Sequence, residues 1–201
     1  MRSCGRLPFL GLLLVMLTAC TVSPENDAVP GCDLEAGPSP ALVLAAQSVP
    51  TAELVPCVNH LQPGWTFQEL DTHMGRTRFW LDSDRTGAAF LVVTLEAACD
   101  IGDAQEVPGG RDSRLPLASD HEGTRRFVDI MQVLPQEDPA GVGQYRGAWY
   151  FRFEGGCVTY RFAAEGQSLE TLPEDVAQAL GFFPREELRR LAHDELDVEF
   201  P

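Results

Sequence analysis

Polar and apolar residues alternate in two long segments of the chain, and this period of two predicts β-strands. In the first segment, RTRFWLD at 76–82, one face carries Thr77, Phe79 and Leu81, and the other carries Arg76, Arg78 and Trp80. Turn-forming DSDRTG overlaps its end, and AAFLVVTLEA follows as a continuous apolar run that is typical of a strand covered on both faces. We therefore expect a hairpin whose second strand is central in its sheet.

A second hairpin is predicted in the segment YRGAWYFRFEGGCVTYRFAAEG, with Gly155 and Gly156 at its turn. Its apolar face carries Trp149, Phe151, Phe153, Val158, Tyr160 and Phe162. Between the two hairpins, the polar segment 101–123 is expected to be a long excursion with one short strand near Val107. Another strand is expected within 125–134.

The C-terminal part changes to a helical pattern. Thr171 can cap a helix that stops at Gly181, and Pro184 suits the first turn of a second helix, PREELRRLAHDEL. In that helix Glu186 can pair with Arg190 four residues later. Because strands come first and helices last, we expect an α+β fold, with one mainly antiparallel sheet built from hairpins and the C-terminal helices packed on a face.

The N-terminal segment has the three parts of a secretory signal. Arg2 and Arg6 supply a positive start, an apolar run of about 11 residues follows at 7–17, and small residues precede Cys20. The run is much shorter than the roughly 20 residues of a membrane-spanning helix. The closing LTAC resembles the lipobox of bacterial lipoproteins, which implies that Cys20 becomes a diacylated, palmitate-carrying N-terminus. We therefore expect a lipid-anchored protein on the extracytoplasmic face of the cell membrane.

The segment after this signal differs in composition from the rest of the chain. Residues 20–40 are rich in proline, glycine and acidic residues, and we expect a flexible tether there. With 1–19 as signal peptide, residues 41–201 then form a single globular α+β domain. The domain begins with ALVLAAQSVPTAELVPCV, which offers two short helical pieces interrupted by Pro50 and Pro56.

The net charge of the chain limits the classes of partner that it can bind. Removal of residues 1–19 takes away two arginines and no acidic residue, so the formal net charge changes from -15 to -17. All 15 basic residues are arginine. Such an acidic surface repels nucleic acid unless its basic residues are strongly clustered, so we expect no nucleic-acid partner.

Four cysteines remain after Cys4 leaves with the signal and Cys20 takes lipid: Cys32, Cys57, Cys99 and Cys157. An even number in an exported chain indicates two disulfides, with three pairings open. If the strand ending near Cys99 lies antiparallel beside the strand that begins at Cys157, the two Cα atoms can approach to the ~4.4–6.8 Å that a disulfide needs. This arrangement favours Cys99–Cys157, and Cys32–Cys57 follows by elimination.

One local motif points to a metal. The segment 82–87, DSDRTG, matches the first half of a calcium loop, with Asp82 and Asp84 as candidate ligands. Val93 occupies the twelfth position, where a bidentate glutamate belongs, and a strand rather than a helix follows. An acidic hairpin turn explains the same residues without an ion, and the sequence implies no cofactor.

Motifs for catalysis are absent from the sequence. There is no GxSxG, HExxH, P-loop or dinucleotide fingerprint, so we assign no catalytic residue. His193 precedes Asp194 in a predicted helix, where adjacent residues do not face one another, so we expect both to be solvated. Paired carboxylates follow no fixed spacing, so the question of an enzyme stays open, with a non-enzymatic protein favoured.

Arginines gather on the face of the two hairpins opposite the apolar stripe. The candidate ligand-binding residues there are Arg76, Arg78, Trp80, Arg146, Tyr150, Arg152 and Arg161. Arginine beside aromatic rings can hold a planar or anionic ligand. Two structural explanations are favoured over this one: acidic C-terminal helices that carry Glu186, Glu187 and Asp194 lie over the arginines, or the arginines form solvated cross-strand pairs.

Several segments resemble a group of uncharacterised actinobacterial envelope proteins and lipoproteins over about residues 45–191. They are AQSVPTAELVPCV, PGW, LDSDRTG, CD, GGCVTYRF and LGFFPREEL. The resemblance implies an extracytoplasmic location and brings no activity. The first hypothesis is thus a membrane-anchored lipoprotein that serves as a non-enzymatic binding or accessory module for an envelope protein or a small ligand. The alternatives are a hydrolase without a recognisable motif and a calcium-stabilised adhesion or structural module.

Overall fold

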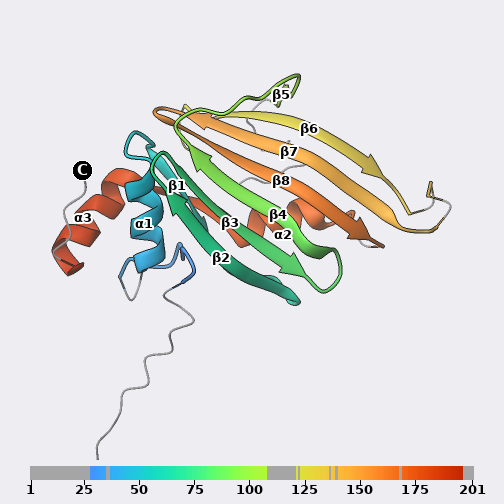
Figure 1. The fold of residues 1–201 in the computed structure, drawn as a ribbon, viewed down its shortest axis with the longest axis horizontal. Coiled ribbons are helices and arrows are strands. Elements are labelled where there is room, and N and C mark those ends of the chain that lie inside the picture. The colour runs from blue at the N-terminus through green and yellow to red at the C-terminus, as the bar shows by residue number, and fades with distance from the viewer. Residues whose placement is uncertain are drawn as a thin grey trace, which may run out of the picture.

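The structure is a computed structural model that describes residues 28–34, 37–107, 121, 123–135, 137–138, 140–167 and 169–196. A seven-stranded antiparallel sheet dominates it, in the order β2-β3-β4-β8-β7-β6-β5 (Figure 1). The strands are β2 (Trp65–His73), β3 (Arg76–Ser83), β4 (Gly87–Glu96), β5 (Gln105–Val107), β6 (Arg125–Val133), β7 (Gly143–Phe153) and β8 (Gly156–Gly166). The predicted mainly antiparallel sheet built from hairpins is confirmed.

The remaining elements are a two-stranded antiparallel pair and three helices. The pair consists of β1 (Leu54–Val58) and β9 (Leu180–Pro184). The helices are α1 (Pro40–Ser48), α2 (Leu172–Ala179) and α3 (Arg185–Leu196). The fold is compatible with the α+β class, although strands make up most of its regular structure.

Both predicted hairpins are present, and they lie side by side. In β3–β4 and β7–β8, the residues expected in the core face the same side of the sheet and are buried. Strands β4 and β8 pair antiparallel, with Glu96 opposite Cys157, and this contact joins the two hairpins into one sheet. The predicted short strand near Val107 is β5, and the strand expected within 125–134 is β6.

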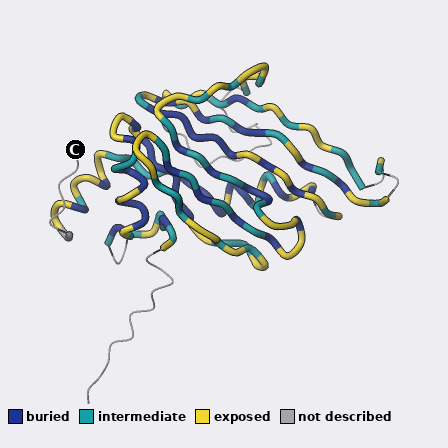
Figure 2. The backbone as a smooth tube through the Cα atoms, in the orientation of Figure 1, coloured by how far each residue is buried: buried dark blue, intermediate teal, exposed yellow. Residues whose placement is uncertain are grey.

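One face of the large sheet, which we call the inner face, forms the core. Phe79, Leu81, Phe151 and Tyr160 are at most 1% exposed, and residues of α1, α2 and β9 belong to the same hydrophobic cluster. The ring of Phe182 in β9 lies 6.2 Å from that of Tyr160, in a stacked arrangement. Buried and more exposed residues alternate along the strands, as Figure 2 shows, because successive side chains point to opposite faces.

Helix α1 is fixed at both ends. Ser39 accepts a hydrogen bond from the backbone N–H of Leu42 at 3.2 Å, as an N-cap residue does. At the other end, the Arg185 guanidinium donates to the carbonyl oxygens of Ala46 and Val49, so a cation satisfies the free carbonyls. Burial lowers the pKa of Arg185.

The prediction of a second helical piece in 41–58 is wrong, because Leu54–Val58 forms strand β1. All five of its residues are buried, and they pair with β9, which the sequence pattern did not predict. Pro56 has no N–H to donate, which a two-stranded pair tolerates better than the centre of a sheet does. Burial between the core and β9 therefore outweighs the local helical pattern.

Three expectations for the C-terminal part need correction. Helix α2 ends at Ala179, because the chain turns into β9 before Gly181. The hydroxyl of Thr171 donates to the Asp175 carboxylate at 3.1 Å and caps no backbone N–H. Helix α3 begins at Arg185, and Glu186 pairs three residues on with Arg189, at 2.7 Å, instead of with Arg190.

Strand β2 is the second strand that the pattern failed to predict. Its pairing with β3 shifts register between Phe67 and Glu69, so a bulge interrupts the alternation that identifies a strand. Strand β4 also differs from expectation, because Val92 and Thr94 are only half-buried. Its apolar run is covered by the core on one face alone.

Part of the predicted tether lies against the domain. Residues 28–34 run beside β1, where the backbone N–H of Cys32 donates to the carbonyl oxygen of Val58 at 2.9 Å. The signal peptide, Cys20 and the rest of the tether up to residue 27 lie outside the described residues. Among the helices that the structure describes, none has the length and apolar character needed to cross a membrane.

Two buried tyrosines predict that the domain becomes less stable at high pH. Burial raises the pKa of Tyr145 from 10.0 to about 12 and raises that of Tyr160 further. Between pH 10 and 12 the unfolded chain releases these phenol protons and the folded domain keeps them, so folding is favoured less as pH rises. We expect the free energy of unfolding to fall by up to about 1.4 kcal/mol per pH unit for each tyrosine.

Urea unfolding at a series of pH values between 9 and 12 measures this slope. The chain contains no lysine, so no ammonium group titrates in the same range. Tyr145→Phe and Tyr160→Phe should each reduce the slope. A slope that neither substitution changes would show that the two buried phenols do not cause the loss.

Candidate functional site

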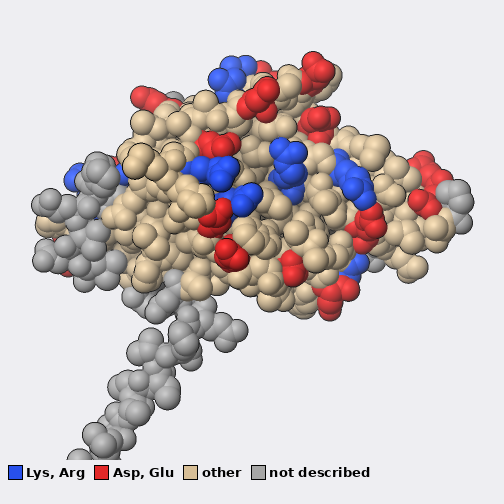
Figure 3. Space-filling view, viewed as in Figure 1, with Lys and Arg blue, Asp and Glu red and all other residues tan. Residues whose placement is uncertain are grey.

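The opposite side of the large sheet, which we call the outer face, holds every candidate ligand-binding residue. On β3 and β7, these residues alternate with buried core residues. They come from three strands: Arg76, Arg78 and Trp80 from β3, Arg146, Tyr150 and Arg152 from β7, and Arg161 from β8. In Figure 3 basic side chains gather across the middle of this face, with acidic groups around them.

Strand register arranges these residues in rows across the sheet. In one row Arg76 faces Glu96, Glu96 faces Cys157, and Cys157 faces Arg152. The next row runs from Arg78 through Thr94 and Thr159 to Tyr150. The third row runs from Trp80 through Val92 and Arg161 to Ala148. The arginines therefore surround a central strip that carries two threonine hydroxyls and a phenol.

Two of the candidate arginines are held by carboxylates. Arg78 pairs with Asp71 of the neighbouring strand β2 at 2.9 Å, and its guanidinium lies 5.4 Å from the centre of the Trp80 ring. Arg146 pairs with Glu165 of β8. These are the cross-strand pairs that one structural explanation expected, and they are partly exposed, so each contributes little to stability.

The other three candidate arginines are Arg76, Arg152 and Arg161, and they form no ion pair with any residue that the structure describes. Arg152 and Arg161 are exposed, and Arg76 is half-buried. Their charges are therefore available to a ligand.

The outer face is more basic than the rest of the molecule. On strands β3, β4, β8 and β7, it carries five arginines against three carboxylates, those of Asp82, Glu96 and Glu165. The whole chain has a formal net charge of -15. With the flanking strands β2, β6 and β5 included, the face has six arginines and seven carboxylates, so its net positive charge is confined to the four central strands.

The idea that acidic helices cover these arginines does not hold for the described residues. Helix α3, which carries Glu186, Glu187 and Asp194, contacts α1 and β9. Both of those elements pack into the core, and Figure 1 shows α3 beyond one end of the large sheet. The outer face is therefore open in the part of the chain that the structure describes.

One further arginine of this face, Arg125, is not among the residues predicted from the sequence. Arg125 of β6 lies opposite Arg152 of β7, and like charges directly opposite one another are unfavourable. Glu106 of β5 pairs with Arg125 at 2.7 Å, and this hydrogen bond lowers the pKa of the Glu106 carboxyl. The alternation in RRFVDIMQV could have predicted that Arg125 lies on one face of a strand. Its position beside Arg152 depends on the strand register, which only the folded sheet shows.

The two candidate calcium ligands lie at the β3–β4 turn. The carboxylate of Asp82 accepts a hydrogen bond from the backbone N–H of Ala89 at 2.7 Å, across the hairpin. Asp84 is exposed, and its carboxylate lies 3.8 Å from the Arg85 guanidinium. In the described part of the chain, no three His, Cys, Asp or Glu residues are close enough to hold a metal together. Asp82 therefore has a structural task in the turn.

The four cysteines of the domain form two disulfides, Cys32–Cys57 and Cys99–Cys157. Their Cα atoms are 5.1 Å and 5.7 Å apart. This is the pairing that the adjacency of β4 and β8 favoured. The first disulfide fastens the segment 28–34 to β1, and the second closes one end of the outer face beside Arg152.

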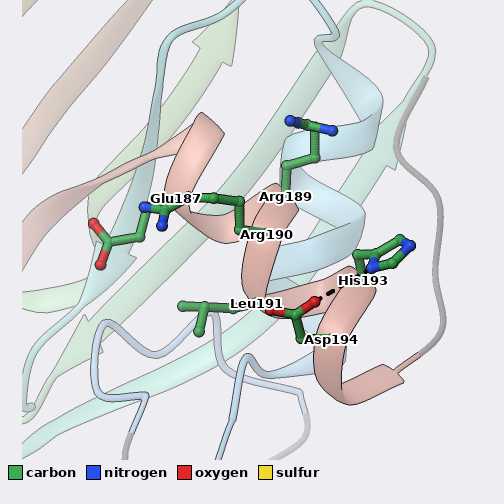
Figure 4. A pocket seen from close by; sticks show the side chains of 6 residues that line it. All are labelled: Glu187, Arg189, Arg190, Leu191, His193 and Asp194. Atoms are coloured by element: carbon green, nitrogen blue, oxygen red, sulfur yellow. Dashed lines mark hydrogen bonds and ion pairs between the residues drawn. The ribbon is translucent and has the colours of Figure 1, made fainter.

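A hollow of about 450 Å³ lies along α3, lined by Glu187, Arg189, Arg190, Leu191, His193 and Asp194. Figure 4 shows these side chains leaving a single helix in several directions. His193 and Asp194 do approach one another, at 3.3 Å, which corrects the expectation for adjacent residues, but both are well exposed. This surface has no second wall and no buried acid or base, so we assign it no chemistry.

A second hollow, of about 430 Å³, lies between Thr51–Leu54, Thr124 and the start of α3. Its charged residues include Glu186 and Arg189, which neutralise each other. The outer face remains the stronger candidate, because three of its arginines have no ion-pair partner among the described residues.

Comparisons with protein-family models, with curated proteins and with solved structures found no match to this chain. The resemblances to bacterial lipoproteins and to actinobacterial envelope proteins therefore stay predictions.

Proposed function

We propose that this chain is a lipid-anchored, non-enzymatic binding domain that works outside the cytoplasmic membrane. The observation that carries the proposal is the open outer face, where Arg76, Arg152 and Arg161 have no ion-pair partner among the described residues. Three arginines without an ion-pair partner among the described residues, on a face that also carries the rings of Trp80 and Tyr150, offer contacts to an anionic or planar partner.

The proposed location is supported by two independent features. The signal-like N-terminus ends in LTAC, and a diacylated Cys20 supplies the two chains that stable anchoring needs. All four remaining cysteines of the domain are in disulfides, which persist in oxidising compartments and are rare in the cytosol. A binding domain held at the membrane by a tether can reach partners in the envelope.

Replacement of the anchor cysteine tests the proposal. Cys20→Ala should move the protein from the membrane fraction to the soluble fraction and abolish palmitate labelling, because no acyl chain remains. Cross-linking of the anchored protein in its native membrane, followed by affinity purification, should recover a specific envelope partner or ligand. Cys4→Ala is the matched control, because Cys4 lies in the expected signal peptide and should leave both results unchanged.

Two results would contradict the proposal separately. Palmitate labelling that survives Cys20→Ala would contradict lipid anchoring through Cys20. If neither the anchored nor the released protein yields a specific partner, the proposed binding function would be contradicted. Each readout therefore tests one part.

A further inference from the structure

We propose that the outer face binds an extended acidic polysaccharide whose charges are widely spaced. The inference rests on the proposed binding function and names the class of its ligand. It is argued from the spacing of the unpaired arginines, the polar groups between them and the small apolar area that the described residues of the face present.

The distances between the unpaired arginines favour a polymeric ligand over a small molecule. Arg76 and Arg152 lie in one row, three strand spacings apart, which corresponds to about 14 Å between Cα atoms. Arg161 lies four residues along β8 from the position opposite Arg152, at a similar distance. One sugar or one phosphate cannot contact all three guanidinium groups, whereas an extended polymer can.

The same distances favour a polymer whose charged groups are far apart. Carboxylates of Glu96 and Glu165 lie on the same face, and they repel a polymer that carries a charge at every position. Duplex DNA carries one charge per ~1.7 Å and needs denser cations than these. A polysaccharide with an anionic group on every second or third sugar can place its charges at the arginines and neutral rings between them.

The middle of the face suits sugar rings. Thr94 and Tyr150 are half-buried and offer a hydroxyl and a phenol, which can donate or accept hydrogen bonds with sugar hydroxyls. Trp80 is half-buried in the adjacent row and presents part of an aromatic ring. Carboxylates or phosphates on the sugars then pair with the guanidinium groups, which match both anions in a bidentate geometry.

An acidic protein fits this face less well. The core of a protein interface is apolar and rich in large side chains. In the part of the chain that the structure describes, the exposed large apolar residues are Leu44, Met74, Met131 and Val142. Only Met131 belongs to the outer face, at its β6 side. Among the described residues, the large apolar side chains at the centre of the face are those of the half-buried Trp80 and Val92, a small area for the core of a protein interface.

Binding of the full-length, detergent-solubilised protein to defined polymers tests the inference. Hyaluronan, with a carboxylate on every second sugar, and phosphomannan, with phosphate groups, represent the two anion chemistries. Dextran supplies neutral sugars, and poly-L-glutamate supplies dense anions without sugars. We expect binding to at least one acidic polysaccharide that weakens as salt rises, little binding to dextran, and weaker binding to poly-L-glutamate.

Substitutions locate the site. Arg152→Gln and Arg161→Gln should each raise the dissociation constant about tenfold or more, because each removes a charge-assisted contact. Trp80→Leu should weaken polysaccharide binding more than poly-L-glutamate binding. Arg190→Gln removes the same charge from exposed α3 and should leave affinity unchanged. Thermal unfolding of every variant checks that the fold is intact, which we expect because Arg152 and Arg161 form no ion pair with any part of the chain that the structure describes.

Several outcomes would overturn the inference. They are no binding to either acidic polysaccharide, equal binding to dextran, equal or tighter binding to poly-L-glutamate, or unchanged affinity in folded Arg152→Gln and Arg161→Gln. Tighter binding to poly-L-glutamate would assign the face to an acidic protein. Failure here together with a specific partner captured from the membrane would leave the proposed binding function standing, so the two failures are distinguishable.

Discussion

Replacement of Cys99 and Cys157 by alanine is expected to lower the free energy of unfolding by about 4 kcal/mol. The disulfide closes a loop between residues 58 positions apart, so it removes much conformational freedom from the unfolded chain. It also joins the ends of β4 and β8, which is the contact that connects the two hairpins. Equilibrium unfolding in urea of the variant and the parent protein, both with Cys32–Cys57 intact, measures the difference.

The other disulfide provides the matched comparison. Cys32 and Cys57 are 25 positions apart, so the same entropy argument gives a somewhat smaller loss, about 3.5 kcal/mol, for their replacement by alanine. Hydrogen exchange should then show faster opening of residues 28–34 and β1, while the large sheet stays protected. An unchanged unfolding midpoint without Cys99–Cys157 would contradict the role assigned to that disulfide.

Trp149→Ala is expected to cost about 3–5 kcal/mol of unfolding free energy. Trp149 is 1% exposed and lies at the centre of the inner face, with the ring of Phe162 at 4.7 Å and that of Tyr160 at 6.3 Å. Its indole N–H donates to the Tyr145 hydroxyl at 3.2 Å. The substitution leaves a large cavity and removes the donor to that phenol, and urea unfolding measures the sum.

Two further variants show how much of this loss comes from buried area and how much depends on the face of the sheet. Trp149→Phe keeps most of the buried area and loses the N–H, so it should cost less than the alanine variant. Trp80→Leu on the outer face should cost less still, because Trp80 is only half-buried and lies outside the core. A loss for Trp80→Leu as large as that for Trp149→Ala would mean that the core has been placed on the wrong side of the sheet.

The sequence pattern predicted the two hairpins because a strand with one buried face alternates strictly. Phe79 and Leu81 in one hairpin, and Trp149 and Phe151 in the other, are buried as expected. The same alternation put the seven candidate binding residues on one side. Their common face therefore follows from local geometry, since residues two apart along a strand always share a side.

Two strands escaped prediction for different physical reasons. Strand β2 contains a bulge between Phe67 and Glu69, which breaks the alternation. Strand β9 has five residues between two helices, and it extends only because β1 lies beside it. The partner of β9 is distant in the chain, whereas β2 pairs with the strand that follows it and only its bulge hides the periodic signal.

The pairing of the arginines could not be obtained from the sequence either. Arg78 is neutralised by Asp71, which lies in the unpredicted strand β2. Arg152 stands opposite Arg125, and whether they meet depends on the register of β6 and β7. The distinction between paired and unpaired arginines, on which the binding proposal depends, is therefore a property of the assembled sheet.

By itself the sequence determined the local features of this protein: a signal-like N-terminus that closes with LTAC, two hairpins with a basic outer face, and four cysteines suited to disulfides. Each depends on residues that are close together in the chain. The tertiary structure decided that β4 lies beside β8, that Cys99 bonds to Cys157, and that Arg76, Arg152 and Arg161 form no ion pair with any described residue. These depend on strand order and register, which are set by burial of the whole inner face and not by any one segment.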